Sequence, residues 1–303
     1  MTFPPYLHSG DCIGIVAPAR KISPSEVKPA IDFLEKQGFR VAVGKNLFNK
    51  HFQFAGTDEE RAADFQAFLD DPDIKAIWCA RGGYGSVRII DRLDFTVFKN
   101  HPKWICGYSD ITVFHSHLHQ LGVSTLHCTM PVKIDREDLE NMNNRTMIQA
   151  LTGGVLAYTM PNFSMNRAGT AAGELVGGNL SILYSLLGSA SDVDTAGKIL
   201  FIEDLDEHLY HVDRMMQALK RAGKLSQLAG LVVGTMEDMH NLDPNNPFGQ
   251  TAEEIVAASC AEYGYPVCYQ FPTGHGEHNV ALKLGAKVTL SVAPGGGTLI
   301  FNE

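Results

Sequence analysis

The sequence contains no long hydrophobic run, no C-x-x-C pair and no excess of basic residues. Its 303 residues include 25 Lys and Arg against 34 Asp and Glu, which gives a net charge of −9. A surface that binds duplex nucleic acid needs a basic stripe, so nucleic acid is not expected as a partner. No apolar stretch approaches the ~18 residues of a membrane-spanning helix, so no membrane association is predicted.

The N-terminal segment has neither the basic start nor the apolar core of a secretory leader. The six cysteines show no spacing typical of a metal site, and most fall within or beside apolar, strand-like runs. Such thiols are typical of small buried side chains in a reducing compartment. We therefore expect a cytoplasmic protein.

Apolar runs alternate with helical patterns through the first half of the chain. Strands are predicted over 12–18, 40–43, 74–80 and 104–106. Helices are predicted over 25–38 and 58–69, through 89–93, and from the turn after the last of these strands to residue 122. This alternation predicts a parallel sheet with helices on both faces, in an α/β domain over residues 1–140. Sheets of this kind bind ligands beyond the carboxyl ends of their strands.

The second half of the chain has a different pattern. Residues 141–167 are rich in Asn, Gly and Pro and are predicted to connect two domains. The domain expected over 168–303 combines strands, glycine turns and a few helices. Its predicted strands cover 173–176, 198–202 and 228–234, and its main helices cover 208–222 and 251–263. The last forty residues read as short strands, so this domain is expected to be smaller and β-rich.

A strand ends and a helix begins within the segment Trp104–Thr112. The apolar run stops at Gly107, so Ser109 lies in a sharp strand-to-helix turn. Such a turn exposes the hydroxyl and presents the following backbone N–H groups to a developing oxyanion, which is the layout of a serine nucleophile. The letters differ from the G-x-S-x-G motif, and a Ser or Asp before a helix is more often an N-cap. Both interpretations stay open on these residues alone.

Two further residues have positions that suit catalysis. Glu203 directly follows an apolar strand, so its carboxylate is expected at the strand's end, where it could orient a histidine. His275 lies in a glycine-flanked loop after another strand, and His278 competes for any role given to it. The pair His115 and His119 has the i, i+4 spacing of half a zinc site, but the sequence offers no third ligand. No metal and no cofactor are therefore predicted.

The loop Arg81–Gly85 follows the strand predicted over 74–80. It reads Arg-Gly-Gly-Tyr-Gly, which matches neither a dinucleotide-binding nor a Walker fingerprint. Its glycines could cradle an anion, or could let a backbone N–H group approach a reacting carbonyl closely.

Seven short motifs occur in one order along nearly the whole chain: Ala17-Pro18-Ala19, Phe54-Ala55-Gly56-Thr57, Arg81-Gly82-Gly83-Tyr84-Gly85, Gly107-Tyr108-Ser109-Asp110, Gly177-Gly178-Asn179-Leu180, Glu203-Asp204 and Gly274-His275. In this order they resemble the LD-carboxypeptidase family of serine peptidases. The resemblance implies that Ser109 is the nucleophile, that His275 is its base and that Glu203 orients His275. It also implies that the backbone N–H groups of Gly83 and Asp110 form the oxyanion hole.

The resemblance further implies a flavodoxin-like N-terminal domain, a smaller β-rich C-terminal domain and an active site in the cleft between them. The implied activity removes the C-terminal D-alanine from cytoplasmic murein tetrapeptides during peptidoglycan recycling. It needs no metal, so chelators are expected to leave it intact. Relatives are often dimers, so a homodimer is expected. Arg81, Tyr84 and Asn179 are candidates for substrate binding, with Arg81 considered for the terminal carboxylate.

One segment departs from the family pattern: His127-Cys128-Thr129 stands where relatives commonly have His-Gly-Pro. This bears on the shape of the pocket and hence on the substrate. A second family activity, hydrolysis of acyl-sulfamoyl or aminoacyl nucleotide antibiotics for self-immunity, is an alternative. Those relatives tend to carry an extra aromatic loop, and the only tryptophans here, Trp78 and Trp104, fall in predicted strands. An alternative of another class is a non-catalytic protein that holds an anion or small ligand in the loop 81–85.

Overall fold

The computed structural model describes residues 1–302, and its contacts divide the chain into two compact units. The first unit contains Met1–Gly154 together with Val280–Lys283, and the second contains Val155–Asn279 and the residues from Leu284 onward. The segment 141–167, predicted as a connector, is divided between them. Its first part forms a helix of the first unit, α5 (Met142–Leu151), and its later part forms a strand of the second, β6 (Ala157–Met160).

The first unit has a six-stranded sheet with the order β11-β5-β4-β3-β1-β2. The strands are β1 (Cys12–Val16), β2 (Arg40–Val43), β3 (Ile74–Cys79), β4 (Trp104–Gly107), β5 (Thr125–His127) and β11 (Leu282–Leu284). All pairings among β1 to β5 are parallel. The order 2-1-3-4-5 is that of flavodoxin-like sheets, which confirms the predicted fold class. The short β11 comes from the C-terminal part of the chain, far outside residues 1–140.

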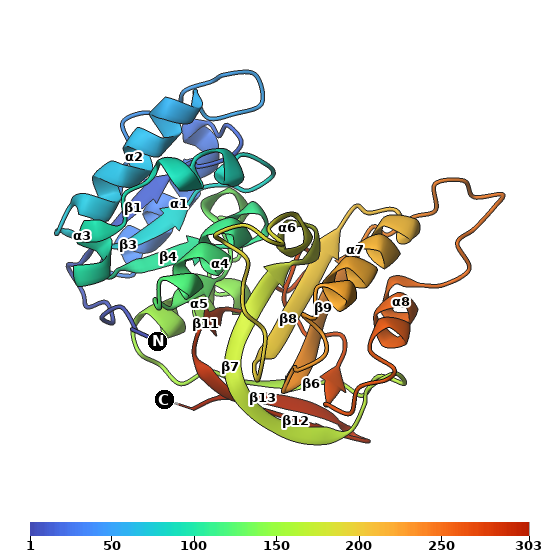
Figure 1. The fold of residues 1–303 in the computed structure, drawn as a ribbon. Coiled ribbons are helices and arrows are strands. Elements are labelled where there is room, and N and C mark those ends of the chain that lie inside the picture. Colours follow the sequence, from blue (N-terminus) through green and yellow to red (C-terminus); the bar gives the residue numbers. More distant parts are fainter. Residues whose placement is uncertain (303) are drawn as a thin grey trace. The chain divides into compact units, whose positions relative to one another are not determined.

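Helices of the first unit are α1 (Pro24–Lys36), α2 (Asp58–Asp70), α3 (Thr96–Asn100), α4 (Thr112–Gln120) and α5. Helix α2 lies against β1 and β3 (Figure 1). It begins at a capping box, in which Thr57 Oγ1 accepts from Glu60 N at 3.2 Å and Glu60 Oε2 accepts from Thr57 N at 2.8 Å. Helices α2 and α4 meet where Phe65 and Phe114 stack with their ring centroids 4.3 Å apart.

The helix predicted through 89–93 is wrong. Two short 3-10 turns, Ser86–Arg88 and Ile90–Arg92, occupy this segment. Its start is fixed by tertiary partners, because Ser86 N donates to Asp110 Oδ2 at 2.8 Å and the buried Arg61 donates to Gly85 O at 3.0 Å. These bonds to residues distant in sequence fix where the segment starts, and the local helical pattern does not extend into a regular helix.

The second unit has a mixed seven-stranded sheet with the order β10-β9-β8-β7-β12-β13-β6. The remaining strands are β7 (Gly169–Asn179), β8 (Ile199–Leu205), β9 (Gly230–Glu237), β10 (Val267–Cys268), β12 (Lys287–Ala293) and β13 (Gly296–Phe301). Strands β7 to β10 pair in parallel, whereas β12 pairs antiparallel with β7 and β13. Strand β7 is longer than the predicted 173–176 because its first half pairs with β12 and its second half with β8.

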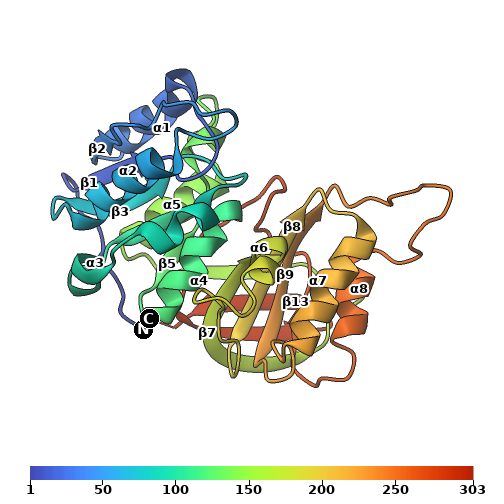
Figure 2. The same ribbon diagram turned by 45° about the horizontal axis from the view of Figure 1, so that its top comes forward.

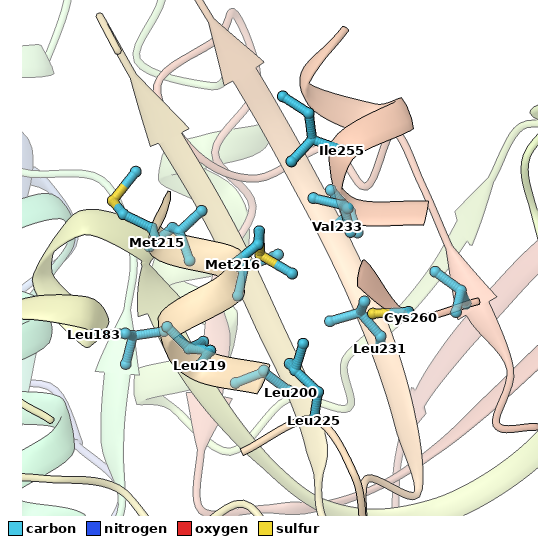
Figure 3. Close-up of a cluster of buried hydrophobic side chains, with 14 of the residues drawn as sticks. Leu183, Leu200, Met215, Met216, Leu219, Leu225, Leu231, Val233, Ile255 and Cys260 are labelled. Atoms are coloured by element: carbon cyan, nitrogen blue, oxygen red, sulfur yellow. The ribbon is translucent and has the colours of Figure 1, made fainter. Parts of the chain in front are cut away.

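The helices of the second unit are α6 (Leu180–Ser185), α7 (Leu209–Arg221) and α8 (Ala252–Ser259). Helices α7 and α8 lie side by side along β8 and β9 (Figure 1 and Figure 2). The helix predicted over 208–222 buries an apolar face here. Figure 3 shows the cluster, in which side chains of α7 face those of the strands: Met215, Met216 and Leu219 against Leu200, Leu231 and Val233. Among residues 1–302, no helix combines the length and hydropathy needed to cross a bilayer.

Candidate active site

The Ser109 turn stands directly after β4 in the first unit. The strand ends at Gly107, where a Cβ atom would lie 2.9 Å from Ile111 Cγ1, so only glycine fits there. Ser109 has φ = 63°, and the chain then enters a 3-10 turn over Ser109–Ile111 and helix α4. This left-handed conformation costs a non-glycine residue about 1–2 kcal/mol, and such strain is concentrated at functional sites. The turn therefore has the sharp strand-to-helix geometry that the sequence predicts.

The glycine loop after β3 lies against this turn. A Cβ atom on Gly82 would be 3.2 Å from Ser109 Oγ and 3.5 Å from the backbone nitrogen of Asp110. Asp110 holds the loop in place, because its buried carboxylate accepts the hydrogen bond from Ser86 N. Burial raises the pKa of Asp110, while the hydrogen bonds from Ser86 oppose that shift. The hydroxyl of Ser109, the backbone of the glycine loop and the Asp110 N–H group are thus brought together.

The side chains of the other residues singled out in this loop, Arg81 and Tyr84, contact other partners. Arg81 forms an ion pair with Glu26 at 3.4 Å, and both side chains are partly exposed. Tyr84 is exposed and its ring centroid lies 6.1 Å from that of Phe54. No described contact joins either side chain to Ser109.

Glu203 and His275 are brought together in the second unit although they lie 72 residues apart. His275 Nδ1 lies 2.6 Å from Glu203 Oε2. The Glu203 side chain is completely buried in β8, and the His275 side chain is one-tenth exposed. A Cβ atom on Gly274 (φ = 136°) would lie 3.0 Å from Glu203 Oε2, so a glycine is required for the loop to approach the carboxylate. His278, the competing candidate, is exposed.

Two polar side chains that the sequence did not single out hold the His275 loop. Thr235 Oγ1, in β9, accepts hydrogen bonds from His275 N at 3.0 Å and from Gly276 N at 3.2 Å. Asn279 Oδ1 accepts from Gly274 N at 3.2 Å. The position of Thr235 just after the strand predicted over 228–234 was the available signal, since polar residues at strand ends face ligand sites in parallel sheets.

Asn179 lies at the end of β7 and is fixed by neighbouring groups. Its Oδ1 caps α6 by accepting from Ile182 N at 3.2 Å, and its Nδ2 donates to Asp204 Oδ1 at 2.8 Å. Asp204 also accepts from Ser181 N at 2.9 Å. Burial, together with the adjacent Glu203 carboxylate, raises the pKa of Asp204 to about 7. Two consecutive acidic residues therefore stand near the end of β8, where Glu203 contacts His275 and Asp204 contacts Asn179 and Ser181.

His115, on α4, contacts neighbouring groups of the fold through both ring nitrogens. His115 is buried, with Nδ1 2.8 Å from Thr125 Oγ1 and Nε2 2.9 Å from Gly107 O, and burial lowers its pKa to about 4. In the part of the chain that the structure describes, no three His, Cys, Asp or Glu side chains are grouped so as to hold a metal ion. His127, in the departing segment, is buried with its ring centroid 5.8 Å from that of Tyr108, the residue before Ser109.

Comparisons with known proteins identify the family of this chain. A family model described as the LD-carboxypeptidase N-terminal domain matches residues 13–128, and one described as the LD-carboxypeptidase C-terminal domain matches residues 172–290. A probable murein peptide carboxypeptidase of Bacillus subtilis is 38% identical over 96% of this chain and 92% of its own length. The microcin C7 self-immunity protein MccF of Escherichia coli is 26% identical over 93% of this chain and 90% of its own length.

A solved structure shows the same similarity in three dimensions. The muramoyltetrapeptide carboxypeptidase from Oxalobacter formigenes matches with a TM-score of 0.88 and 29% identity, over 96% of this chain and 99% of that one. The two matched domain models cover most of the sequence, and the relatives align along almost its full length. The chain therefore belongs to the LD-carboxypeptidase family.

Proposed function

We propose that this protein is a serine LD-carboxypeptidase that removes the C-terminal D-alanine from murein tetrapeptides through an acyl-enzyme. Ser109, His275 and Glu203 are its nucleophile, general base and orienting carboxylate. The observation that carries the proposal is the buried 2.6 Å contact between Glu203 and His275, because a catalytic triad needs a carboxylate that orients its histidine. The names of the Bacillus subtilis and Oxalobacter formigenes relatives supply the substrate class.

The chemistry follows from the roles of these groups. Glu203 accepts a hydrogen bond from Nδ1–H of His275, which fixes the tautomer whose lone pair is on Nε2. Nε2 takes the proton of Ser109 as its oxygen attacks the carbonyl that precedes D-alanine, and Glu203 stabilises the resulting imidazolium. His275 then protonates the departing amine, and water, activated by the same histidine, releases the shortened peptide from Ser109.

The oxyanion is assigned to the backbone N–H groups of Gly83 and Asp110. The short approach of Gly82 to both Ser109 and Asp110 N supports this role, because it places the glycine loop beside the attacking hydroxyl. Loss of one such donor typically lowers kcat by ~10²–10³. The strained φ of Ser109 fits the same purpose, since it holds the nucleophile in position before substrate binds.

The test is mass spectrometry of the products that purified protein forms from a murein tetrapeptide, a pentapeptide and an aminoacyl-sulfamoyl nucleotide. We expect release of D-alanine from the tetrapeptide and its loss in Ser109→Ala and in His275→Ala. Near-normal turnover by either variant would contradict the triad. Cleavage of the nucleotide alone would assign this chain the kind of activity that the name of its Escherichia coli relative suggests, and no cleavage with no labelling by a serine-directed probe would favour a binding protein.

The homodimer and the cytoplasmic location expected from the sequence belong to the same proposal. Light scattering on the purified protein measures the first, and fractionation of the producing cells measures the second. A monomer in solution would contradict the dimer without affecting the chemistry.

A further inference from the structure

Arg20 lies beside the nucleophile turn although no motif drew attention to it. Its backbone N–H donates to Gly82 O at 3.4 Å. The position that a Cβ atom of Gly83 would take is 2.5 Å from Arg20 Cδ and 2.7 Å from Nε, so the arginine stem occupies the space over that glycine. The neighbouring Gly82 lies close to Ser109, since a Cβ atom there would be 3.2 Å from Ser109 Oγ. Arg20 and Ser109 therefore both lie against the same glycine loop.

The position of Arg20 is fixed by the backbone. Ala55 N donates to Ala19 O at 3.1 Å, and Lys21 N donates to Gln53 O at 3.0 Å, on either side of Arg20. These bonds hold Arg20 in an antiparallel bridge with Phe54. A cation on a rigid support loses less conformational freedom when it binds an anion, which is a condition for a good binding residue.

Arg20 differs from its neighbours in what its guanidinium contacts. The nearby arginines each have a carboxylate partner: Arg61 and Arg88 pair with Asp58, Arg81 with Glu26, and Arg92 with Glu59. Within residues 1–302, the exposed Arg20 guanidinium has no hydrogen bond and no ion pair. An unpaired surface arginine is common, so its significance depends on where Arg20 lies relative to the sheet.

That place is the topological switch point of the first unit. Strand β1 has β2 on one side and β3 on the other, so the chain reverses its order there. Arg20 follows the end of β1, and Gly83 follows the end of β3. In open α/β sheets, ligands bind outside the carboxyl ends of the strands at this point. Arg20 is thus an unpaired cation at the position where such a sheet binds its ligand.

We propose that Arg20 binds the C-terminal carboxylate of the substrate, an inference that rests on the proposed carboxypeptidase activity. In a peptide ending in D-alanine, the terminal carboxyl carbon lies only about 3–4 Å from the scissile carbonyl carbon. Its partner must therefore stand close to Ser109. A guanidinium matches a carboxylate with two parallel hydrogen bonds. Arg20 would confine cleavage to the last residue of the chain, and Arg81, the candidate from sequence, is held by Glu26 instead.

The experiment compares a murein tetrapeptide with its C-terminal amide on the wild-type protein, Arg20→Gln, Arg20→Lys, Arg81→Gln and Arg92→Gln. The last variant is the charge-matched control, because Arg92 pairs with Glu59 on the surface. A hydrogen-bonded charge pair is worth about 10- to 100-fold in kcat/KM. We expect kcat/KM of the wild type to be higher for the acid than for the amide by that factor. In Arg20→Gln, kcat/KM for the acid should fall to the value for the amide, and the value for the amide should not change. Arg20→Lys should be intermediate, and Arg81→Gln and Arg92→Gln should keep the full preference.

Each other outcome has a distinct meaning. An unchanged acid-to-amide ratio in Arg20→Gln overturns the assignment while leaving the carboxypeptidase activity in place. Loss of the ratio in Arg81→Gln also overturns it and restores the candidate from sequence. If the wild-type protein releases no D-alanine from the acid, the proposed function fails, and the assignment of Arg20 fails with it. Thermal unfolding of every variant checks that the fold is retained.

Discussion

Thr235 offers a sharp test of how the His275 loop is positioned. The change Thr235→Val keeps the shape of the side chain and removes the hydroxyl that accepts from His275 N and Gly276 N. Both N–H groups then lose their partner in a half-buried place, where water replaces it only in part. Because the two bonds hold the residue after Gly274, their loss frees the loop that presents the imidazole to Glu203.

The size of the effect follows from the two hydrogen bonds. Each contributes about 1 kcal/mol net, so the loop loses about 2 kcal/mol of its preference for the observed conformation. If that free energy is needed to bring His275 into position, kcat falls about 30-fold, since 1.36 kcal/mol corresponds to tenfold. KM should change little, because Thr235 makes no proposed contact with the substrate.

The assay is steady-state release of D-alanine from a murein tetrapeptide, with thermal unfolding measured in parallel. Thr235→Ser is the matched control, because it keeps the hydroxyl and loses only a methyl group, and it should retain most of the wild-type kcat. The reasoning would be refuted if Thr235→Val kept kcat within twofold of the wild type. It would also be refuted if Thr235→Ser and Thr235→Val lost activity equally, since the hydroxyl would then not be the cause.

Two further predictions follow from close approaches and from burial. Gly82→Ala would place a Cβ atom 3.1 Å from Ser109 Cβ and 3.2 Å from Oγ, so the hydroxyl must shift. We expect kcat to fall by about tenfold or more, with little change in melting temperature. A kcat within twofold of the wild type would contradict this. Asp204 has a native pKa raised to about 7, against about 3.9 unfolded, so the native state holds the extra proton between those values. Its contribution to stability is therefore full below pH ~4 and is lost as the pH rises to 7. Relative to the wild type, Asp204→Asn should lose less melting temperature between pH 4.5 and pH 7.5, and parallel curves for the two proteins would argue against a raised pKa.

Local sequence patterns predicted much of the fold because strands and helices have short periods. The parallel α/β order of the first unit, the amphipathic helix α7 and the sharp turn at Ser109 could all be predicted from neighbouring residues. The segment through 89–93 could not, since its start is held by Asp110 and Arg61, which are distant in sequence. A helical pattern carries no information about such partners.

The candidate site divides in the same way. The motifs that contain Ser109, Glu203 and His275 indicated the family from the sequence alone, and the family models match most of the chain. The tertiary structure alone decided that Glu203 and His275 touch although they lie 72 residues apart, and that Thr235 holds the His275 loop. It also decided that, among the described residues, the Arg20 guanidinium beside the glycine loop has no partner whereas Arg81 has one. The physical reason is that strand order and register determine which loop ends meet at the edge of a sheet, and both depend on pairing between segments far apart in the chain.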